Sequence, residues 1–373
     1  MHSLKDIIRA KLQKNFIRPL YLLLLSGFST RHVVGWCSKS LNIMSMEDRN
    51  SIWFAVVNVY AASEKASSLW EKAEKRMCEK GIIYHCNRTG RSGNAMEITF
   101  DACVAGYRRF VAVGGDGTIH DVLNGIAGFI DWKAQDGSSV SFNDFTVGVI
   151  PVGSGNDWAK TAGVPKDICK AVDVLAAGKT GRQDVVKVSV LDPGALPQMV
   201  EQSVSYMANI GGVGIDARVC EYVNSKKKEG KRGKILYVTS LLRAIRERVP
   251  AVARVVCDGN EVFNGAYLSM AFGVGKYSGG GMRQTPAAIL DDGLLDLTVI
   301  PDLKLRRIAR EVPRLFTGTF LEVPELITAK AKVITVIPDA GSSREPAEVD
   351  GEVIGKAPVR LEVLDTQINV VIA

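Results

Sequence analysis

Continuous apolar runs alternate with stretches of helical periodicity between residues 51 and 183. The run IWFAVVN at 52–58 combines aromatic and branched residues, which predicts a strand covered on both faces. Apolar side chains from Ala66 to Met77 then recur at helical spacing, and Gly81 ends the segment. Further strands are predicted at 82–86, 110–113 and 145–150, and further helical stretches near 95–102, 118–128 and 167–178. This order predicts a parallel sheet with helices on its faces and ligands bound where the strands end.

Beyond Gln183 the pattern changes to short strands separated by turn residues. Strands are predicted at 185–191, 205–211, 253–257, 266–274, 294–300, 332–337, 359–364 and 368–372. Asp258 and Gly259 stand between two of them, which is typical of a tight hairpin. Helical insertions are predicted near 235–245 and 305–316. The second half is therefore expected to be a mainly antiparallel domain.

These patterns divide the chain into an N-terminal extension (1–50), an α/β domain (51–183) and a β-rich domain (184–373). The extension is basic and contains an apolar run at 20–28, shorter than the about 20 residues that span a bilayer. Two interpretations stay open: an anchor lying at a membrane surface, or a start of translation at Met44 or Met46. The second is favoured because regular structure is predicted only from residue 51.

Composition and charge restrict the kinds of domain, partner and metal site that the chain can have. The chain has 373 residues, of which 46% are hydrophobic, enough for two packed domains. Its net charge of +7 is modest, but lysines and an arginine cluster at 226–234, which suits a phosphate group, an anionic membrane or a solvated loop. Seven scattered cysteines without a Cys-x-x-Cys pair indicate reduced thiols in the cytosol. The four histidines lack the spacing of a zinc site.

A glycine-rich turn follows the strand predicted at 110–113. Its sequence is Gly114-Gly115-Asp116-Gly117-Thr118, at the start of a helical stretch. Backbone amides at such a junction face an incoming anion, and phosphate is the natural guest. Asp116 cannot bind phosphate itself, so we expect it to reach phosphate through Mg²⁺ or to hydrogen-bond a hydroxyl group. A tight turn without a ligand is the alternative.

A second turn of the same kind follows the strand predicted at 145–150. It reads Gly153-Ser154-Gly155-Asn156-Asp157 and also opens a helical stretch. Ser154 can donate a hydrogen bond to a phosphate oxygen, and Asn156 or Asp157 can cap the helix or orient the first turn. Capping alone is the alternative for Asp157. The two turns are expected to line one site.

Several motifs occur together and in a fixed order along the chain. They are GGDGT, NGIAG, GVIPVGSGNDWAKTAGVP, GGGMRQTPAAILDDGLLDLTVI and EVDGE. This set resembles the diacylglycerol kinase catalytic family, and within it the YegS/BmrU-like bacterial lipid kinases, which are related to sphingosine and ceramide kinases. The resemblance covers roughly residues 51–373, and it implies a Rossmann-like α/β domain of the NAD kinase and diacylglycerol kinase type followed by a β-sandwich-like domain. ATP would lie between the domains, with the lipid headgroup meeting its γ-phosphate.

The resemblance also implies roles for particular residues. The nucleotide site would comprise Asn58, Thr89, Gly114, Gly115, Asp116, Gly117, Thr118, Ile119, His120, Ser154, Gly155 and Asn156. Glu352, in the motif Val-Asp-Gly-Glu, would be the base that accepts the proton of the lipid hydroxyl, with Asp116 as the rival base. One departure from the family pattern follows Asn58, where Val59 and Tyr60 replace the usual proline and small residue.

Paired acids at the turn Asp291-Asp292-Gly293 suit a hard cation with oxygen ligands. The resemblance implies a structural Mg²⁺ held by the Asp292 side chain and by the backbone carbonyls of Ile289 and Leu294. A turn without a metal is the alternative.

The expected function is that of an ATP- and Mg²⁺-dependent kinase that phosphorylates a hydroxyl of a membrane lipid such as diacylglycerol, a sphingoid base or ceramide. Such an enzyme would be cytoplasmic and peripheral at the anionic inner face of the membrane, with no nucleic acid partner. Its oligomeric state, a homodimer included, is not readable from the sequence. Two alternatives are an NAD kinase-like enzyme, which the later motifs disfavour, and a nucleotide-binding lipid sensor without turnover. The presence of Asp116, Asp292 and Glu352 favours an active enzyme.

Overall fold

The computed structural model describes residues 46–60, 65–90, 94–195, 198–228, 234–247 and 251–373. The expectations for the extension, including the apolar run at 20–28, concern residues outside these ranges. The first described element is the short helix α3 (Met46–Ser51). Across the described ranges, no helix combines the length and the apolar character needed to cross a membrane.

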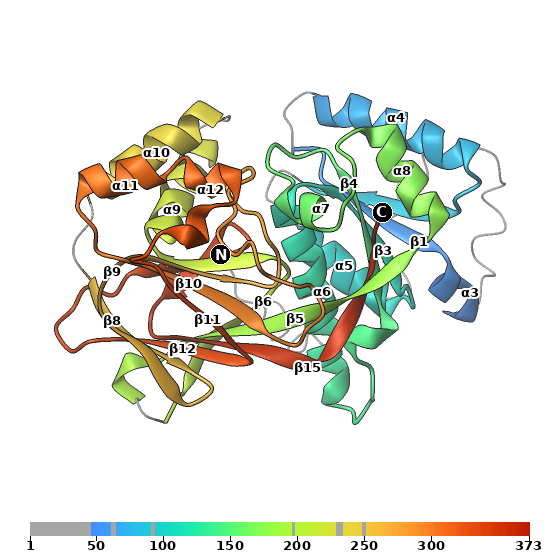
Figure 1. Cartoon of the computed structure of the whole chain (residues 1–373). Coiled ribbons are helices and arrows are strands. Elements are labelled where there is room, and N and C mark those ends of the chain that lie inside the picture. The colour runs from blue at the N-terminus through green and yellow to red at the C-terminus, as the bar shows by residue number, and fades with distance from the viewer. Residues whose placement is uncertain (1–45, 61–64, 91–93, 196–197, 229–233, 248–250) are drawn as a thin grey trace.

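The first lobe contains a parallel sheet in the order β4-β3-β1-β2 (Figure 1). Its strands are β1 (Trp53–Val57), β2 (Tyr84–Arg88), β3 (Arg109–Gly114) and β4 (Thr146–Pro151). Its helices are α4 (Lys65–Glu79), α5 (Ala95–Val104), α6 (Asp116–Ala134), α7 (Asp157–Thr161) and α8 (Ile168–Ala177). Phe54 and Val56 pack with α5 and α6, whereas Trp53 and Ala55 face α4 and α8. The predicted parallel sheet covered on both faces is thereby confirmed.

The second lobe is built mainly from antiparallel strands around a separate apolar core. Its strands are β6 (Glu201–Met207), β7 (Ile210–Gly214), β8 (Ala251–Cys257), β9 (Asn260–Gly273), β10 (Leu295–Pro301), β11 (Ile327–Ala331), β12 (Val333–Pro338), β13 (Pro346–Val349) and β14 (Glu352–Lys356). Asp258 and Gly259, with φ of 48° and 85°, form the β8–β9 hairpin as predicted. The strand predicted at 205–211 is instead divided between β6 and β7.

Four helices cover one end of the second lobe (Figure 1). They are α9 (Ile215–Lys228), α10 (Lys234–Arg246), α11 (Leu305–Glu311) and α12 (Arg314–Thr317). The predicted insertions at 235–245 and 305–316 correspond to α10 and to α11 with α12. Helix α9 was not predicted. Short 3₁₀ turns complete the described elements at Phe142–Asp144, Pro193–Ala195 and Phe320–Glu322.

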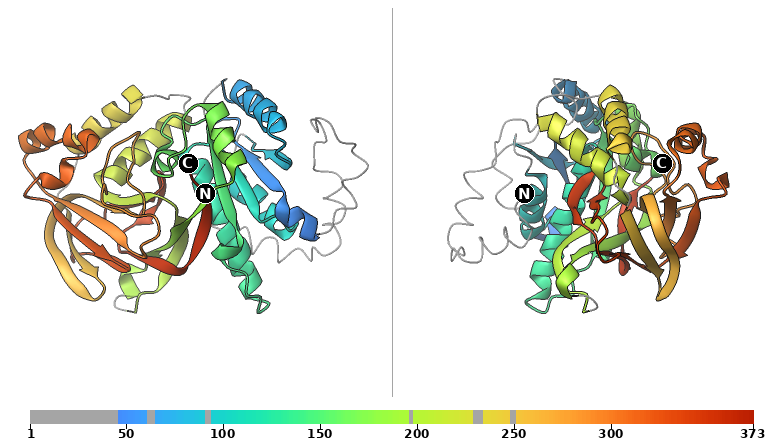
Figure 2. Two further views of the ribbon diagram at one scale, coloured as in Figure 1. Left: turned by 45° about the vertical axis from the view of Figure 1, so that its right-hand side comes forward. Right: turned by 90° about the vertical axis from the view of Figure 1, so that its left-hand side faces the viewer.

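Two long strands join the lobes. β5 (Thr180–Leu191) and β15 (Val359–Val371) pair antiparallel along most of their length, and Figures 1 and 2 show them running between the lobes. β15 also pairs antiparallel with β12 and parallel with β4, so it links the two halves into one hydrogen-bonded sheet. The strands predicted at 359–364 and 368–372 are therefore one strand, with a register shift between Val363 and Gln367.

Candidate active site

The two glycine turns lie against each other at the ends of β3 and β4. A Cβ atom on Gly153 would stand only 2.5 Å from the Cα atom of Gly115, so this approach requires glycine. The amide of Val152 also donates to the carbonyl of Gly114 over 3.0 Å. The parallel pairing of β3 with β4 thus brings both turns to one edge of the sheet.

Replacing Gly153 by alanine should separate the two turns. The added methyl group would meet the backbone of Gly115, which cannot rotate away, so we expect nucleotide affinity to fall by about tenfold or more. Gly265→Ala, on β9 of the second lobe, is the matched control, because the nearest atom to its new Cβ would be Phe263 Cζ at the ordinary contact distance of 3.5 Å. Calorimetric titration with ATP measures the effect, and equal affinities for both variants would contradict the prediction.

Asp116 connects the first turn to the second. Its Oδ1 atom accepts a hydrogen bond from the backbone amide of Trp158 over 2.9 Å, in the first turn of α7. Burial, with a contribution from the nearby Asp157 carboxylate, raises the pKa of Asp116 to about 6. Asn156 or Asp157, in the second turn, was expected to cap the helix or to orient the first turn. In the structure, the side chain of Asp116 in the first turn instead contacts the backbone of the second.

The second turn is fixed by its own polar residues. Asn156 adopts a left-handed backbone conformation with φ of 55°, and its side chain donates to the carbonyl of Gly153 over 2.8 Å. Asp157 pairs with Lys160 at 2.6 Å and accepts the amide of Gly280, from the second lobe, at 2.7 Å. Ser154 remains exposed at the tip of the turn. Asp157 is therefore not the cap of α7, whose N-cap residue is Asn156 and has no capping hydrogen bond from its side chain; Asp157 instead ties this turn to the second lobe.

Asn58, directly after β1, contacts Thr118 of the first turn. The Asn58 side-chain amide donates to Thr118 Oγ1 over 3.1 Å, and its oxygen accepts the amide of Tyr60. A Cβ atom on Gly114 would lie 2.0 Å from Thr118 Oγ1, so this position also requires glycine. Thr89 is buried at the end of β2, and within the described residues its hydroxyl has no hydrogen-bond partner.

Two residues expected at the nucleotide site face elsewhere. Ile119 packs into the apolar core beneath the sheet. His120 is buried, and its Nδ1 atom lies 3.2 Å from Asp350 Oδ2. Burial alone lowers the pKa of His120, but the hydrogen bond and charge of Asp350 raise it overall.

Asp350 holds the β13–β14 hairpin in place. Its two carboxylate oxygens accept the backbone amides of Ala208 and Asn209, each over 2.9 Å. These two residues form the break between β6 and β7. Asp350 and Gly351 take φ of 52° and 88° at the tip of the hairpin. The His120 contact adds α6, so Asp350 joins three separate parts of the chain.

Glu352 follows directly after this hairpin tip and reaches the first glycine turn. Its Oε1 atom would lie 3.6 Å from a Cβ atom on Gly117. The structure therefore brings Glu352 to the first turn, which Asp116 connects to the second.

Two further acids that the sequence analysis did not select lie close by. Glu348 is buried and accepts the amide of Gly351 over 2.8 Å, and burial raises its pKa well above the usual value. Burial, with a contribution from Glu352, raises the pKa of Asp121 to about 6. In the sequence, Asp121 is marked only by its position next to His120, and Glu348 only by its position two residues before Asp350.

Asp292, whose side chain was expected to hold a structural Mg²⁺, has other partners in the chain. Its Oδ1 atom accepts the amide of Leu294 over 3.1 Å, and its Oδ2 atom lies 3.1 Å from the ammonium group of Lys330. The expected carbonyl ligands of Ile289 and Leu294 stay a prediction. Mg²⁺ requires near-octahedral oxygen ligands at about 2.0–2.1 Å. Among the residues placed in the structure, no group of three or more His, Cys, Asp or Glu side chains is arranged to hold a metal ion.

Two glycine turns touch at the end of a parallel sheet, and an acid from the antiparallel lobe reaches the first of them, an arrangement that suits the phosphate groups of a nucleotide. The family described as "Diacylglycerol kinase catalytic domain" matches residues 53–188. The family described as "YegS C-terminal NAD kinase beta sandwich-like domain" matches residues 209–372. The chain belongs to the diacylglycerol kinase catalytic family, with the YegS type of C-terminal domain.

Similar proteins extend over most of the chain. A "Diacylglycerol kinase" of Staphylococcus carnosus is 27% identical over 295 residues, which cover 79% of this chain and 86% of that protein. A "Probable lipid kinase YegS-like" of an Enterobacter species is 24% identical over 305 residues, covering 81% and 91%. The crystal structure of a diacylglycerol kinase from Bacillus anthracis has a TM-score of 0.64 at 19% identity and covers 87% of this chain and 97% of its own. That structure supports the fold.

Proposed function

We propose that this protein is an ATP-dependent lipid kinase that transfers the γ-phosphate of ATP to a hydroxyl group of a membrane lipid. The observation that carries the proposal is the position of Glu352, whose carboxylate reaches the first glycine turn from the second lobe. The names of the relatives in Staphylococcus carnosus and Enterobacter, a diacylglycerol kinase and a lipid kinase, support the choice of substrate class. Diacylglycerol is the first candidate, followed by a sphingoid base or ceramide.

The two turns are the proposed binding site for the ATP phosphates. Helix α6 begins at Asp116, so its amides and the positive end of its dipole favour negative charge at the first turn. Further donors are the exposed Ser154 and the Thr89 hydroxyl, which has no partner among the residues that the structure describes. Mg²⁺ that accompanies ATP would neutralise phosphate charge. On this chain, Asp116 keeps the second turn in position through its contact with Trp158.

Glu352 is the proposed base of the reaction. In phosphoryl transfer the proton of the attacking alcohol leaves late, so a positioned carboxylate can accept it without prior deprotonation. Asp116 is the rival, but its Oδ1 atom already accepts a backbone amide. A base needs an oxygen that faces the alcohol, which favours Glu352.

A kinase assay with radiolabelled ATP tests the proposal. The acceptors are mixed vesicles containing diacylglycerol, ceramide, sphingosine or polyprenol, with NAD as a separate acceptor and Asp116→Ala as the negative control. We expect labelled lipid from at least one vesicle type and none from the control. Labelled NAD without labelled lipid would instead support an NAD kinase, and ATP binding without any labelled product would support a sensor.

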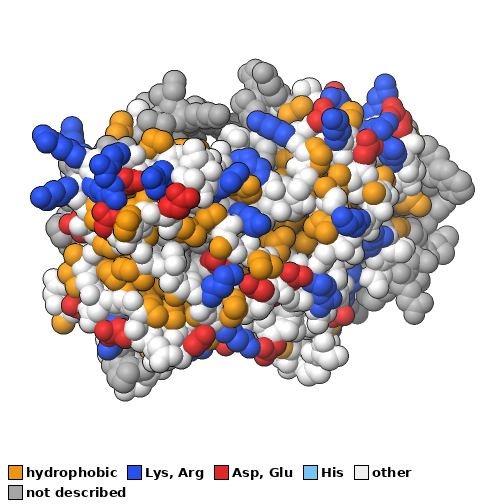
Figure 3. All heavy atoms as spheres, viewed as in Figure 1, with side chains coloured by type: hydrophobic (Ala, Val, Ile, Leu, Met, Phe, Trp, Pro, Cys, Tyr) orange, Lys and Arg blue, Asp and Glu red, His pale blue; other side chains and the backbone are white. Residues whose placement is uncertain are grey.

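The helical end of the second lobe is the proposed membrane contact. Leu242 on α10 is 63% exposed and Phe316 on α12 is 53% exposed. Figure 3 shows basic side chains gathered with apolar ones at this end of the molecule. Apolar side chains among basic ones are typical of surfaces that bind anionic bilayers. The basic cluster predicted for this role is divided between α9 and α10, and residues 229–233 lie outside the described ranges.

The double variant Leu242→Glu/Phe316→Glu should bind anionic vesicles about tenfold more weakly or worse, because it replaces two apolar contacts with charges that the bilayer repels. Ile83→Glu is the matched control, since Ile83 is 70% exposed but lies on the first lobe. Vesicle sedimentation measures binding. Equal loss in both proteins would show that charge alone, rather than this surface, governs binding.

A further inference from the structure

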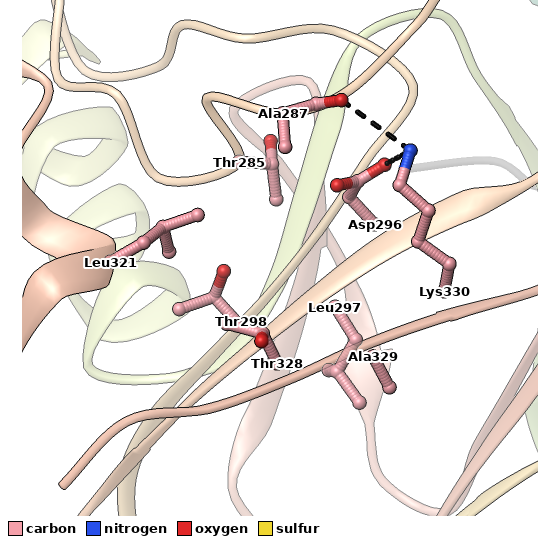
Figure 4. A pocket seen from close by; sticks show the side chains of 9 residues that line it. All are labelled: Thr285, Ala287, Asp296, Leu297, Thr298, Leu321, Thr328, Ala329 and Lys330. Carbon is pink, nitrogen blue, oxygen red and sulfur yellow. Dashed lines mark hydrogen bonds and ion pairs between the residues drawn. The ribbon is translucent and has the colours of Figure 1, made fainter. Parts of the chain in front are cut away.

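Lys330 lies in the wall of a small cavity in the second lobe (Figure 4). The cavity has a volume of about 210 Å³ and is bordered by β10, β11 and the loop before β10. Lys330 stands directly opposite Asp296 in the antiparallel pairing of β11 with β10. Its position is therefore set by the register of the sheet.

The ammonium group of Lys330 meets three oxygen atoms. Its Nζ atom lies 2.9 Å from Asp296 Oδ2, 3.1 Å from Asp292 Oδ2 and 3.4 Å from the carbonyl oxygen of Ala287. Figure 4 shows the contacts with Asp296 and Ala287. The contacts with Asp292 and Ala287 are hydrogen bonds that the ammonium group donates, and the contact with Asp296 is an ion pair.

The turn that receives Lys330 is fastened to the strands that join the lobes. The amide of Gly293 donates to Asp184 Oδ2 on β5 over 2.7 Å. Gln367 on β15 donates to Asp184 Oδ1 over 2.8 Å. The turn therefore connects the cavity wall to both crossing strands, and a cation at Asp292 strengthens that connection.

A divalent ion would have to share Asp292 with this ammonium group. Both Asp292 oxygens already have partners, namely Lys330 and the amide of Leu294. The ammonium group of Lys330 lies within 3.1 Å of a carboxylate oxygen of both Asp292 and Asp296, so a positive charge already occupies the space beside Asp292. Two cations on one carboxylate repel each other, and Mg²⁺ also requires closely placed oxygens on several sides.

We propose that the ammonium group of Lys330 is the resident cation of the turn at 291–294 and takes the place of a structural Mg²⁺. The connection from β11 through the turn at 291–294 to β5 and β15 is then made by side chains of the chain itself, without a metal ion. Chelation of divalent ions would remove the Mg²⁺ that accompanies ATP but would leave this connection unchanged. The inference stands independently of the kinase activity proposed above, because its test measures stability without nucleotide.

Thermal unfolding in EDTA and in millimolar Mg²⁺, both without nucleotide, tests the proposal. The wild-type protein should have the same Tm in both solutions. Lys330→Met keeps the length of the side chain but not its charge, so its Tm should fall by a few degrees in EDTA and recover in part with Mg²⁺, which enters the vacated site. Adding Asp292→Asn should abolish the recovery. Lys332→Met is the control, because Lys332 pairs with the 88% exposed Asp365.

Two results would overturn the proposal. One is a wild-type Tm that rises with Mg²⁺ and no longer rises in Asp292→Asn, because the turn would then hold a divalent ion beside Lys330. The other is an unchanged Tm for Lys330→Met in EDTA. If Lys330→Met does not fold, binding of Mn²⁺ to the wild-type protein is measured instead by electron paramagnetic resonance. Mn²⁺ binding that is lost in Asp292→Asn would refute the proposal. No Mn²⁺ binding that depends on Asp292 would support it.

Discussion

Glu352→Gln should lower kcat for lipid phosphorylation by about 10²- to 10⁴-fold, the usual contribution of a general base. The amide keeps the size of the side chain but cannot accept the proton. ATP affinity should remain close to that of the wild-type protein, because the backbone of the glycine turns is unchanged. Steady-state kinetics with the preferred lipid, combined with calorimetric titration of ATP, measures both quantities.

Asp116→Asn provides the comparison that separates the two acids. Asp116→Ala removes the oxygen that accepts the amide of Trp158, whereas asparagine keeps an oxygen that can accept it. We therefore expect Asp116→Ala to lose ATP affinity as well as turnover, and Asp116→Asn to keep most of both. If Asp116→Asn bound ATP normally and lost turnover, while Glu352→Gln stayed active, Asp116 would be the base and our assignment would be wrong.

Asp350→Ala should destabilise the protein by about 3–5 kcal/mol, the usual cost of breaking a buried ion pair. The substitution leaves the buried amides of Ala208 and Asn209 without their acceptor and His120 without its partner. It should also reduce turnover, because Glu352 lies two residues further along the same hairpin. Urea unfolding and the lipid kinase assay measure the two effects.

Asp258→Ala is a close geometric control for this experiment. Asp258 also occupies a hairpin tip, with φ of 48°, and its carboxylate also accepts two backbone amides, those of Lys332 and Val333. These hydrogen bonds are exposed, and they join the β8–β9 hairpin to the start of β12 rather than to the hairpin that carries Glu352. We therefore expect a smaller loss of stability and normal turnover. A similar loss of turnover in both variants would mean that general destabilisation, not the position of Glu352, causes it.

Features that depend on neighbouring residues in the chain could be predicted from the sequence. The β1 run is apolar throughout because alternate side chains enter two different cores. Helix α8 is bounded as expected, with Asp167 capping its start and Gly178 in a left-handed conformation at its end. Both glycine turns also lie where strands give way to helices, so their position at the ends of β3 and β4 could be predicted.

Features that depend on backbone partners far away could not be predicted. Asp116 and Asp350 bind backbone amides, which any residue can offer, so no side-chain pattern marks their partners. The crossing strand β15 looked like two strands because polar residues interrupt its apolar pattern where the register shifts before Gln367. Glu352 was found only through the resemblance, since a hairpin acid has no distinctive pattern of its own.

The path of β15 has a consequence for how the protein is made. Asn369 on β15 pairs with Thr146, the first residue of β4. The side chain of Asn369 also donates to the carbonyl of Phe145, 224 residues earlier in the chain. During synthesis, the parallel sheet of the first lobe therefore emerges from the ribosome with β4 still an open edge. Only after the second lobe has been translated can β15 cover that edge. We infer that the two lobes complete their folding together, as one cooperative unit with many contacts between distant residues.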